Sequence, residues 1–576
     1  MEGTTKLVLV AALATLLLMP MPSPRQPTKP AEVASTHPFR SDGVRDPPVD
    51  ATTLDRKVLF GYQGWFSCPG AGSAYNPWDH WFRGPPEADS LTVDYWPDVS
   101  ELTQGERCAT LMTLPGGGTA AVFSSYRQPT VLRHFEWMRD YGIDGVFLQR
   151  FVTRTTTADR AALDQVARNV QAAAEQTGRV FALMYDTTGS AAADVSTLAN
   201  DWRYLVDTLR ITASPRYLHH DGRPVLGIWG LGFQGNAATP SDAAWLLGNL
   251  TTNASASYRA ALVGGVPTYW RTLTGDSQTD PAWARVYRSF DVLSPWTVGR
   301  YVDNASADAY RTDVLEPDLT EASASNVTYM PVVFPGFSWR NLHAGPLNEI
   351  PRNGGHLIWR QAYNALAAGA TMLYVAMFDE VDEGTAMFKL APRPKQLPVG
   401  ATLVPLNIDG YSLPSDWYLR VGREITKMTR GDIPLTRQMP IAPDTTPPVI
   451  SIQAPQAGAV LQTRLATVRG VASDNDALES VEVSLEGASW ATANGTTAWY
   501  ANLMLAAGSD TIHARATDVS GNAASTSVNV SVQEAPPAGP SKLPVELGAL
   551  LAATTVVATA FLLYRRRRRA NLGRRP

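Results

Sequence analysis

The chain has 576 residues and a formal net charge of −4, with 44% hydrophobic and 18% charged residues. Because a single hydrophobic core usually stops growing at roughly 250 to 300 residues, this length predicts two or more folded units. The near balance of charge excludes the broad basic surface of a nucleic-acid-binding protein, since the one dense basic run lies at the C-terminal end beside an apolar stretch. We therefore predict no nucleic-acid partner.

The N-terminal segment has the features of an export signal. Lys6 precedes the apolar run Leu7–Met19, which is followed by several prolines. This pattern predicts a secretory signal peptide over residues 1–22, with an uncleaved N-terminal anchor as the alternative. Residues 23–54 are rich in Pro, Ser, Thr and charge and lack a sustained apolar period, which predicts a flexible leader.

Two cysteines occur in the whole chain, Cys68 and Cys108. The oxidising environment outside a cell allows two such thiols to pair. Two separate buried thiols are the alternative.

Residues 55–445 alternate between short β-branched or aromatic runs and longer amphipathic stretches, which predicts parallel strands joined by helices. Helices are expected at 158–177, 194–210 and 355–368. The eight expected strands are Val58–Phe66, Ile143–Phe151, Val180–Asp186, Pro224–Trp229, Ala261–Trp270, Val292–Tyr301, Met330–Trp339 and Thr371–Phe378.

Eight such alternations favour an α/β fold of the (β/α)8 barrel type, in which active sites lie at the C-terminal ends of the strands. A doubly wound open sheet is the alternative. The barrel is preferred because no glycine-rich dinucleotide-binding turn follows the first strand and because polar or aromatic residues end nearly every strand.

A different pattern begins at Asp444, where the sequence reads Asp-Thr-Thr-Pro-Pro. Over residues 446–534 short alternating runs are separated by turn-forming residues, which predicts a small all-β sandwich. The segment, including its Asp518–Asn522 turn, resembles the bacterial immunoglobulin-like modules of surface proteins. Its expected role is a spacer, with sugar binding as the alternative.

The C-terminal segment has the features of a membrane anchor. Residues 535–544 contain three prolines and predict a short stiff stalk. Leu547–Tyr564 is uncharged and precedes five arginines, which predicts one transmembrane helix over 545–564 and a basic cytoplasmic tail over 565–576. We therefore expect a single-pass protein at the cell surface, with its catalytic domain outside.

The densest acidic cluster in the chain follows the eighth expected strand and comprises Asp379, Glu380, Asp382 and Glu383. Cleavage of a glycosidic bond commonly needs two carboxyl groups, one that donates a proton to the leaving oxygen and one that assists attack from the other side. Crowding of like charges also raises the pKa of at least one member and favours a protonated acid near neutral pH. From spacing alone, a solvated acidic loop or a calcium site remains an alternative.

Three motifs lie in order around this cluster: Pro-Gly-Phe at 335–337, Arg-Asn-Gly at 352–354 and Glu-x-x-Glu-Gly-Thr at 380–385. On these motifs the segment 334–389 resembles glycoside hydrolase family 99, the endo-α-mannosidases and endo-α-mannanases. A weaker likeness extends to Gly-Tyr-Gln-Gly-Trp-Phe at 61–66 and to Tyr-Gly-Ile-Asp-Gly in the second expected strand.

The resemblance implies a role for each glutamate. Glu380 would deprotonate the substrate's own 2-hydroxyl to give an epoxide-like intermediate, and Glu383 would act as general acid and then base, with retention. The family usually has Trp after the first glutamate and His before the second, where this chain has Val381 and Asp382. These departures leave the mannose preference open and keep the related family 71 of α-1,3-glucanases as a competitor.

Side chains near the expected strand ends supply a candidate sugar cleft, because aromatic faces stack on pyranose rings while amides and charges bind hydroxyls. The candidate substrate-binding residues are Tyr62, Trp65, Gln149, Arg150, Tyr185, Asp186, Trp229, Tyr269, Trp270, Trp296, Trp339, Arg352, Asp379 and Asp382.

No metal or other cofactor is predicted. His80 and the pair His219-His220 lack the spacing of a metal site, and neither a Gly-x-Ser-x-Gly elbow nor a phosphate-binding Walker loop occurs. The sequence therefore predicts a glycoside hydrolase that cleaves α-linked glycans or polysaccharides with retention, with Glu380 and Glu383 as catalytic residues. The alternative is a non-catalytic lectin or adhesin on the same barrel.

Overall fold

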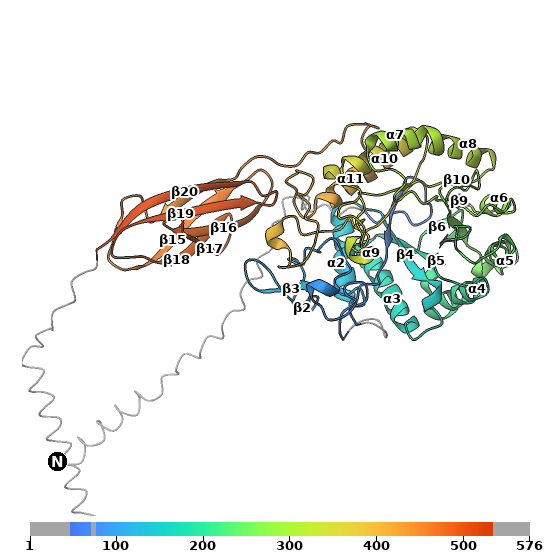
Figure 1. The fold of residues 1–576 in the computed structure, drawn as a ribbon, viewed down its shortest axis with the longest axis horizontal. Coiled ribbons are helices and arrows are strands. Elements are labelled where there is room, and N and C mark those ends of the chain that lie inside the picture. The colour runs from blue at the N-terminus through green and yellow to red at the C-terminus, as the bar shows by residue number, and fades with distance from the viewer. Residues whose placement is uncertain (1–46, 71–76, 534–576) are drawn as a thin grey trace, which may run out of the picture. The chain divides into compact units, whose positions relative to one another are not determined.

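The computed structural model describes residues 47–70 and 77–533. They form a barrel-like α/β domain, from β1 (Val58–Tyr62) to α11 (Trp417–Arg430), and a β-sandwich over residues 449–532, as Figure 1 shows.

Within the described residues, the barrel-like domain is built on nine parallel strands in the order β10-β9-β8-β7-β5-β4-β1-β12-β11. Met330 and Pro331 alone separate β10 from β11 in the chain, and these two strands pair with β9 and β12, so the sheet returns toward its starting strand. This order is consistent with the predicted barrel. Besides β1, the strands are β4 (Gly145–Phe151), β5 (Val180–Asp186), β7 (Arg223–Trp229), β8 (Ala261–Gly265), β9 (Val292–Leu293), β10 (Thr328–Tyr329), β11 (Val332–Val333) and β12 (Leu373–Val375).

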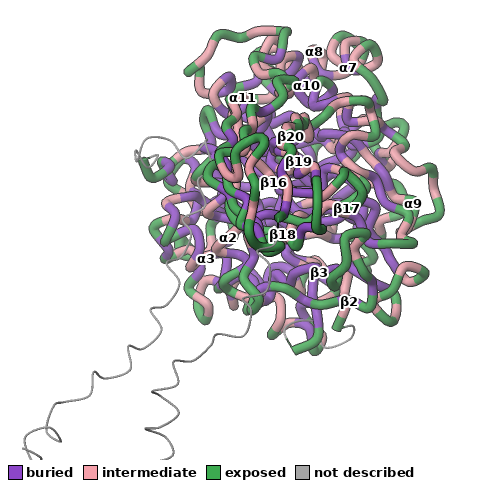
Figure 2. The backbone as a smooth tube through the Cα atoms, turned by 90° about the vertical axis from the view of Figure 1, so that its left-hand side faces the viewer, coloured by how far each residue is buried: buried purple, intermediate pink, exposed green. Residues whose placement is uncertain are grey.

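Amphipathic helices follow the strands. In α3 (Arg160–Thr177) the buried side chains include Val166, Val170 and Ala173, which recur at helical spacing, so one face of the helix packs inward while the other stays exposed. The resulting mixture of buried and exposed stretches along α3 and α11 can be followed in Figure 2. The other helices are α2 (Gln128–Asp140), α4 (Asp194–Tyr204), α5 (Pro240–Leu250), α6 (Trp283–Tyr287), α7 (Asn304–Tyr310), α8 (Glu316–Ala324), α9 (Arg340–His343) and α10 (His356–Ala367).

Among the described residues, the barrel-like domain also contains two small antiparallel strand pairs. β2 (Cys108–Thr113) pairs with β3 (Thr119–Val122), and β6 (His219–His220) pairs with β7. A disulfide joins Cys68 to Cys108 with a Cα–Cα distance of 6.3 Å. The predicted pairing of the two cysteines is therefore confirmed, and the alternative of two separate thiols is wrong.

The observed strands begin close to the expected positions; three end where expected, at Phe151, Asp186 and Trp229, and the other five end earlier. The expected strand Val58–Phe66 ends at Tyr62, and Val292–Tyr301 ends at Leu293. After β1 the chain turns at Gly64, whose φ of 63° lies in the left-handed region that favours glycine. The aromatic residues beyond these ends therefore lie in loops at the C-terminal side of the sheet, where barrel enzymes place their sites.

The β-sandwich packs two antiparallel-rich sheets around its own apolar core. β15 alternates exposed and buried residues along its whole length, which is the pattern of a strand with one face in a core. Trp499, Ile512 and Val468 are among the buried core side chains. The strands are β13 (Val449–Ala454), β14 (Val460–Leu461), β15 (Leu465–Ser473), β16 (Leu478–Leu485), β17 (Ser489–Thr492), β18 (Ala498–Met504), β19 (Gly508–Asp518) and β20 (Ala523–Val532), in the orders β13-β15-β18 and β14-β20-β19-β16-β17.

The prediction of a membrane anchor needs correction. Within the described residues no helix is long and apolar enough to cross a membrane. A crossing helix needs about 20 mostly apolar residues, whereas α3 has 18 residues and includes charged side chains such as Asp164 and Glu175. The transmembrane helix in the fold class and the single-pass location at the cell surface are therefore withdrawn. The predicted span 545–564 lies outside the described residues, as do the predicted signal peptide and cytoplasmic tail.

Candidate active site

Glu380 lies just after β12, at the C-terminal end of the parallel sheet. Its side chain is buried, and its two carboxyl oxygens accept hydrogen bonds from different segments. Gln63 Nε2 donates to Oε1 at 2.6 Å, and Thr385 Oγ1 donates to Oε2 at 3.0 Å. Because each oxygen has its own donor, the carboxyl group is fixed in one orientation.

Asp379 links this loop to the turn after β1. Its carboxylate accepts backbone N–H bonds from Gln63 at 2.7 Å and from Gly64 at 3.0 Å. The neighbouring Gly61 allows a close approach, since a Cβ there would lie 2.1 Å from Met377 Sδ and 2.2 Å from Tyr374 Oη. An added Cβ at this position would therefore force the side chains of Met377 and Tyr374 to move beside the acidic loop.

Glu383 is half-buried and lies in a loop held through its backbone. Its carbonyl oxygen accepts a 2.9 Å hydrogen bond from the Ser338 N–H. Arg352 donates to the carbonyl oxygens of Gly384 and Ala386 at 2.7 and 2.8 Å. Among the described residues no donor bonds the Glu383 carboxyl group itself, which leaves that group free to exchange a proton with a ligand.

Burial and mutual repulsion raise the pKa values of the acidic cluster. For Glu383, burial is the largest cause, followed by the charges of Asp382 and Asp186, and the pKa rises to about 7. Burial likewise holds the pKa of Glu380 well above its ordinary value, with repulsion from Glu383 and Asp382 as further causes. The buried Asp379 has its pKa raised to about 7. A cluster of this kind retains protons near neutral pH.

Asp382 contacts a histidine from a distant loop. The carboxylate is buried, and its Oδ2 lies 3.0 Å from His80 Nδ1. The His80 ring stacks on Trp65 at 3.7 Å with an interplanar angle of 5°, and Trp65 in turn stacks on Phe151 at 5.2 Å. Trp65 Nε1 and Asp382 Oδ1 are buried without a hydrogen-bond partner in the described part of the chain.

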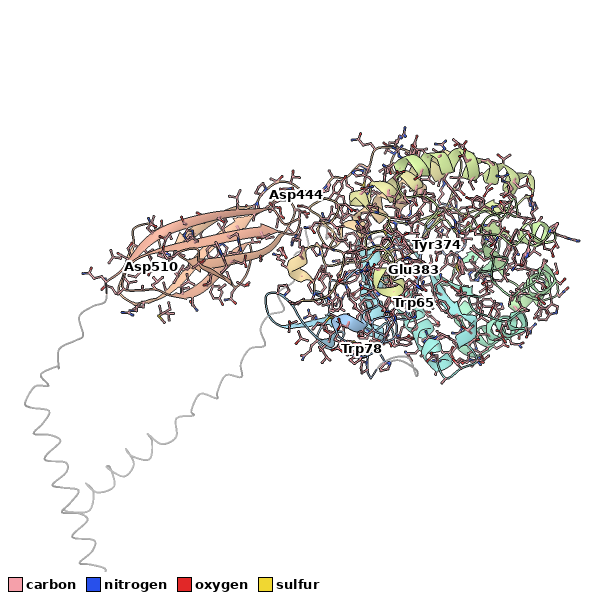
Figure 3. All side chains as sticks on the ribbon, in the orientation of Figure 1. Trp65, Trp78, Tyr374, Glu383, Asp444 and Asp510 are labelled. Atoms are coloured by element: carbon pink, nitrogen blue, oxygen red, sulfur yellow. A yellow bond between two sulfur atoms is a disulfide. The ribbon has the colours of Figure 1, made fainter. Side chains whose placement is uncertain are left out.

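A second group of aromatic side chains follows the other strands of the sheet. Tyr374 of β12 accepts a 3.0 Å bond from Gln149 Nε2, and its ring lies 6.5 Å from that of Trp296. Trp296 meets Trp229 edge-to-face at 5.5 Å. The charges of Glu380, Asp186 and Asp379 add to burial in raising the pKa of Tyr374, so this tyrosine borders the acidic cluster. Trp65, Tyr374 and Glu383 are labelled in Figure 3.

Several candidate binding residues instead have buried protein partners. Arg150 forms ion pairs with Asp201 at 2.6 Å and Asp164 at 2.9 Å, and the Tyr185 hydroxyl donates to Asp201. Trp270 is fully buried and donates from Nε1 to Asp318 at 2.9 Å. These side chains tie strands and loops to the surrounding helices.

Four further candidates have other surroundings. The buried hydroxyl of Tyr62 lies 2.9 Å from His134 Nδ1. The Arg352 guanidinium is buried between the rings of Tyr95 and Tyr418, at 4.3 and 4.5 Å. Trp339 is half-buried against Phe337 and His343, and Tyr269 is half-buried against Gly275.

Three residues of the site were not among the candidates named from the sequence. Gln63 and Thr385 bond Glu380, and Tyr374 borders the cluster. A signal existed for the first two, because both lie inside motifs that carry the resemblance. His80 was considered only as a metal ligand, and its contact with Asp382 joins residues 302 positions apart.

Within the described residues, the group of carboxylates that could hold a metal ion is formed by two residues of the β-sandwich and one that precedes it, and it does not include the acidic loop. Asp444, Asp474 and Asp518 each offer an oxygen, and these oxygens lie within 4.8 Å of one another.

The comparisons with known proteins bear on both folded regions. A family model described as a bacterial Ig domain matches residues 448–514. No curated protein matches the chain. A modular endo-β-1,4-mannanase from Cellulomonas fimi covers 67% of this chain and 86% of its own, with 14% identity and a TM-score of 0.29, which is too low to support an argument.

Two solved structures of a GH99 endo-α-mannosidase from Bacteroides thetaiotaomicron are more similar. One covers 66% of this chain and 99% of its own, with 15% identity and a TM-score of 0.50. The other, in complex with bis-tris-propane, covers the same shares with 16% identity and a TM-score of 0.49. At this identity the likeness concerns the fold: the chain has a fold similar to that of a GH99 glycoside hydrolase.

Proposed function

We propose that this chain is a glycoside hydrolase of the family 99 type, which cleaves α-linked glycans with retention of configuration. The observation that carries the proposal is the pairing of Glu380 and Glu383 at the C-terminal end of β12, one held by two donors and the other half-buried and free of them. Two such carboxyl groups, with different surroundings, meet the requirement of glycosidic cleavage.

Glu383 has the properties of the general acid. Burial, together with the charges of Asp382 and Asp186, raises its pKa to about 7, so a proton remains available near neutral pH. Its partly exposed carboxyl group can reach the oxygen of a leaving sugar. In the second half of the reaction the same group, now ionised, accepts a proton from the attacking water.

Glu380 has the properties of the base. Burial makes it a stronger proton acceptor than an exposed glutamate, while the hydrogen bonds from Gln63 and Thr385 oppose burial and favour its ionised form. The proposed reaction requires an ionised Glu380 and a protonated Glu383 when Glu380 faces the substrate hydroxyl, and the two hydrogen bonds to Glu380 favour that state.

The reaction then balances in two steps. Glu380 removes the proton of the substrate 2-hydroxyl, O2 bonds to C1, the C1–O bond to the leaving sugar breaks, and Glu383 protonates that oxygen. Water next bonds to C1 as the C1–O2 bond breaks, Glu383 takes the proton of the water, and Glu380 returns its proton to O2. Two inversions at C1 give net retention.

Aromatic side chains on both sides of the acidic cluster support a carbohydrate substrate. Trp65 lies on one side in its stack with His80 and Phe151, and Trp296 and Trp229 follow from Tyr374 on the other. Trp65 Nε1 and Trp229 Nε1 are buried without acceptors in the described part of the chain. Half-buried tryptophans with free donors can stack on a sugar ring and bond its hydroxyls.

The test uses the full chain against a panel of α-mannans and α-glucans, with product anomers followed by NMR. The wild type is expected to release products with retention. Glu380→Gln and Glu383→Gln should each reduce kcat by about 10²–10⁴-fold while keeping glycan binding. Glu87→Gln, at an exposed position away from the acidic loop, serves as the matched control and should hydrolyse normally.

Two results would contradict the proposal in different ways. Inversion at the anomeric centre would favour the chemistry of family 71. Binding to glycans without cleavage of any member of the panel would favour a lectin or adhesin on the same barrel.

A further inference from the structure

His80 is held in place by contacts on several sides. Its ring stacks on Trp65 at 3.7 Å, and its Nδ1 lies 3.0 Å from Asp382 Oδ2. The carbonyl oxygen of His80 accepts a 2.6 Å bond from Thr92 Oγ1, and the preceding Asp79 forms a 2.8 Å ion pair with Arg154. Its ring therefore has a fixed position above the tryptophan.

The backbone of His80 supports the same conclusion. Its φ of 60° lies in the left-handed region, which costs a residue with a side chain about 1–2 kcal/mol. Such a conformation persists when the surroundings favour it, and it clusters at functional sites. Here the residue with this conformation is His80, which contacts Asp382 of the acidic loop.

Asp382 depends on His80 for its one hydrogen-bond donor among the described residues. The side chain is 1% exposed and its Oδ1 has no hydrogen-bond partner in the described part of the chain. The charge of Asp382 in turn contributes to raising the pKa values of Glu380, Glu383 and Asp379.

We propose that His80 is a positioning residue: its contact with Asp382 Oδ2 holds that carboxyl group in place beside the Glu380–Glu383 pair. A role of His80 in catalysis rests on the proposed hydrolytic function. The effect of a well-placed Asp382 on the pKa values of Glu380 and Glu383 does not require turnover. The other acidic group that acts on the pair is Asp186, which raises the pKa of Glu383, and the Asp79–Arg154 ion pair flanks His80.

Two substitutions at His80 separate the hydrogen bond from the backbone and the ring. Asn and Gly both accept a left-handed φ and both lose the stack on Trp65, but only Asn offers an N–H donor to Asp382. Asp382→Asn removes the charge while keeping the shape. Melting temperatures of all variants establish that each one folds.

The first readout is infrared titration of the protonated carboxyl band of the free full-length protein, which needs no substrate. His80→Gly and Asp382→Asn should each move the highest carboxyl midpoints down by roughly one pH unit, and the double variant should move them no further. His80→Asn should stay close to the wild type. Equal behaviour of the Asn and Gly variants, or additive shifts in the double variant, would overturn the proposal.

The second readout is the pH profile of kcat/KM on whichever glycan is cleaved. The upper limb, which reports the general acid, should move down in His80→Gly by the same amount as the infrared midpoint and remain in place in His80→Asn. The infrared shift in a protein that cleaves nothing would support this inference and contradict the proposed function. Hydrolysis with no infrared shift would do the reverse.

Discussion

The barrel-like domain contains two buried clusters of charge that differ in composition. In one, Arg150 meets Asp164 and Asp201 at 2.9 and 2.6 Å, and every charge has an opposite partner. In the other, Glu380 and Glu383 lie among further carboxylates, and their pKa values are raised by burial and by neighbouring charges, with that of Asp382 acting on both.

The difference in composition distinguishes a cluster that stabilises the fold from a cluster suited to proton transfer. Buried opposite charges that satisfy each other fix the relative positions of secondary-structure elements, and breaking them exposes one element to an unpaired charge. Buried like charges oppose folding and are retained where a proton must be held near neutral pH. Arg150 bonds residues of α3 and α4, whereas Glu380 bonds the turn after β1 at the open end of the sheet.

The largest expected effect concerns the like-charged cluster. Glu380→Gln should reduce kcat by about 10²–10⁴-fold, because the amide cannot accept the hydroxyl proton. Thermal unfolding of the same variant should occur at an equal or higher temperature, since a buried repulsion is removed. The activity assay checks the fall in kcat, and calorimetry checks the unfolding temperature. A strong loss of stability would mean that Glu380, like Arg150, serves mainly to hold the fold together.

The paired cluster should respond in the opposite way. Arg150→Met removes the cation between the buried Asp164 and Asp201 and leaves only Arg160, 3.8 Å from Asp201, so we expect a loss of about 3–5 kcal/mol in the free energy of unfolding. Urea denaturation measures this loss. Arg139→Met, which breaks the more exposed pair with Asp140, is the control and should cost about 0–1 kcal/mol. Comparable losses in the two variants would remove the distinction between the clusters.

A third substitution tests the contact that brings β1 beside the acidic loop. Gly61→Ala would place a methyl group 2.1 Å from Met377 Sδ, and Tyr374 would have to move as well. We expect a loss of about 1–3 kcal/mol from overpacking, with a fall in kcat because Tyr374 borders Glu380. Gly116→Ala, at a position where an added methyl group meets nothing within 4 Å, should leave both unchanged.

The sequence predicts where the strands begin and where the acidic loop lies, but not which side each strand residue faces. Gln149 and Arg150 are neighbours in β4, and both were predicted to bind sugar. Gln149 bonds Tyr374 across the sheet, while Arg150 points to Asp164 and Asp201 on the helices. Strand residues alternate between faces, and a parallel sheet buries both, so the pattern of apolar residues does not identify the inner face.

Contacts between distant segments explain what else the sequence could not predict. Gln63 and Glu380 are 317 positions apart, and His80 and Asp382 are 302 apart. Each pair meets because parallel strands bring their C-terminal ends to one edge. A motif can draw attention to Gln63, but the acceptor of its amide follows only from the order in which the strands assemble.

The smallest expected effect is a pH dependence of stability that comes from the like-charged cluster. The pKa of Glu383 is raised to about 7 in the folded chain from an ordinary value of 4.5, so the folded state binds a proton that the unfolded state releases. This contribution to stability is present below pH 4.5 and is lost as the pH rises toward about 7. Unfolding free energies measured from pH 4.5 to 7.5 should therefore decline more steeply in the wild type than in Glu383→Gln. Arg139→Met should keep the wild-type slope over this range, because its partner Asp140 is exposed and the change leaves no buried carboxylate without a cation. A slope unchanged by Glu383→Gln would mean that the glutamate is ionised throughout, and it would then lack the proton that a general acid must donate.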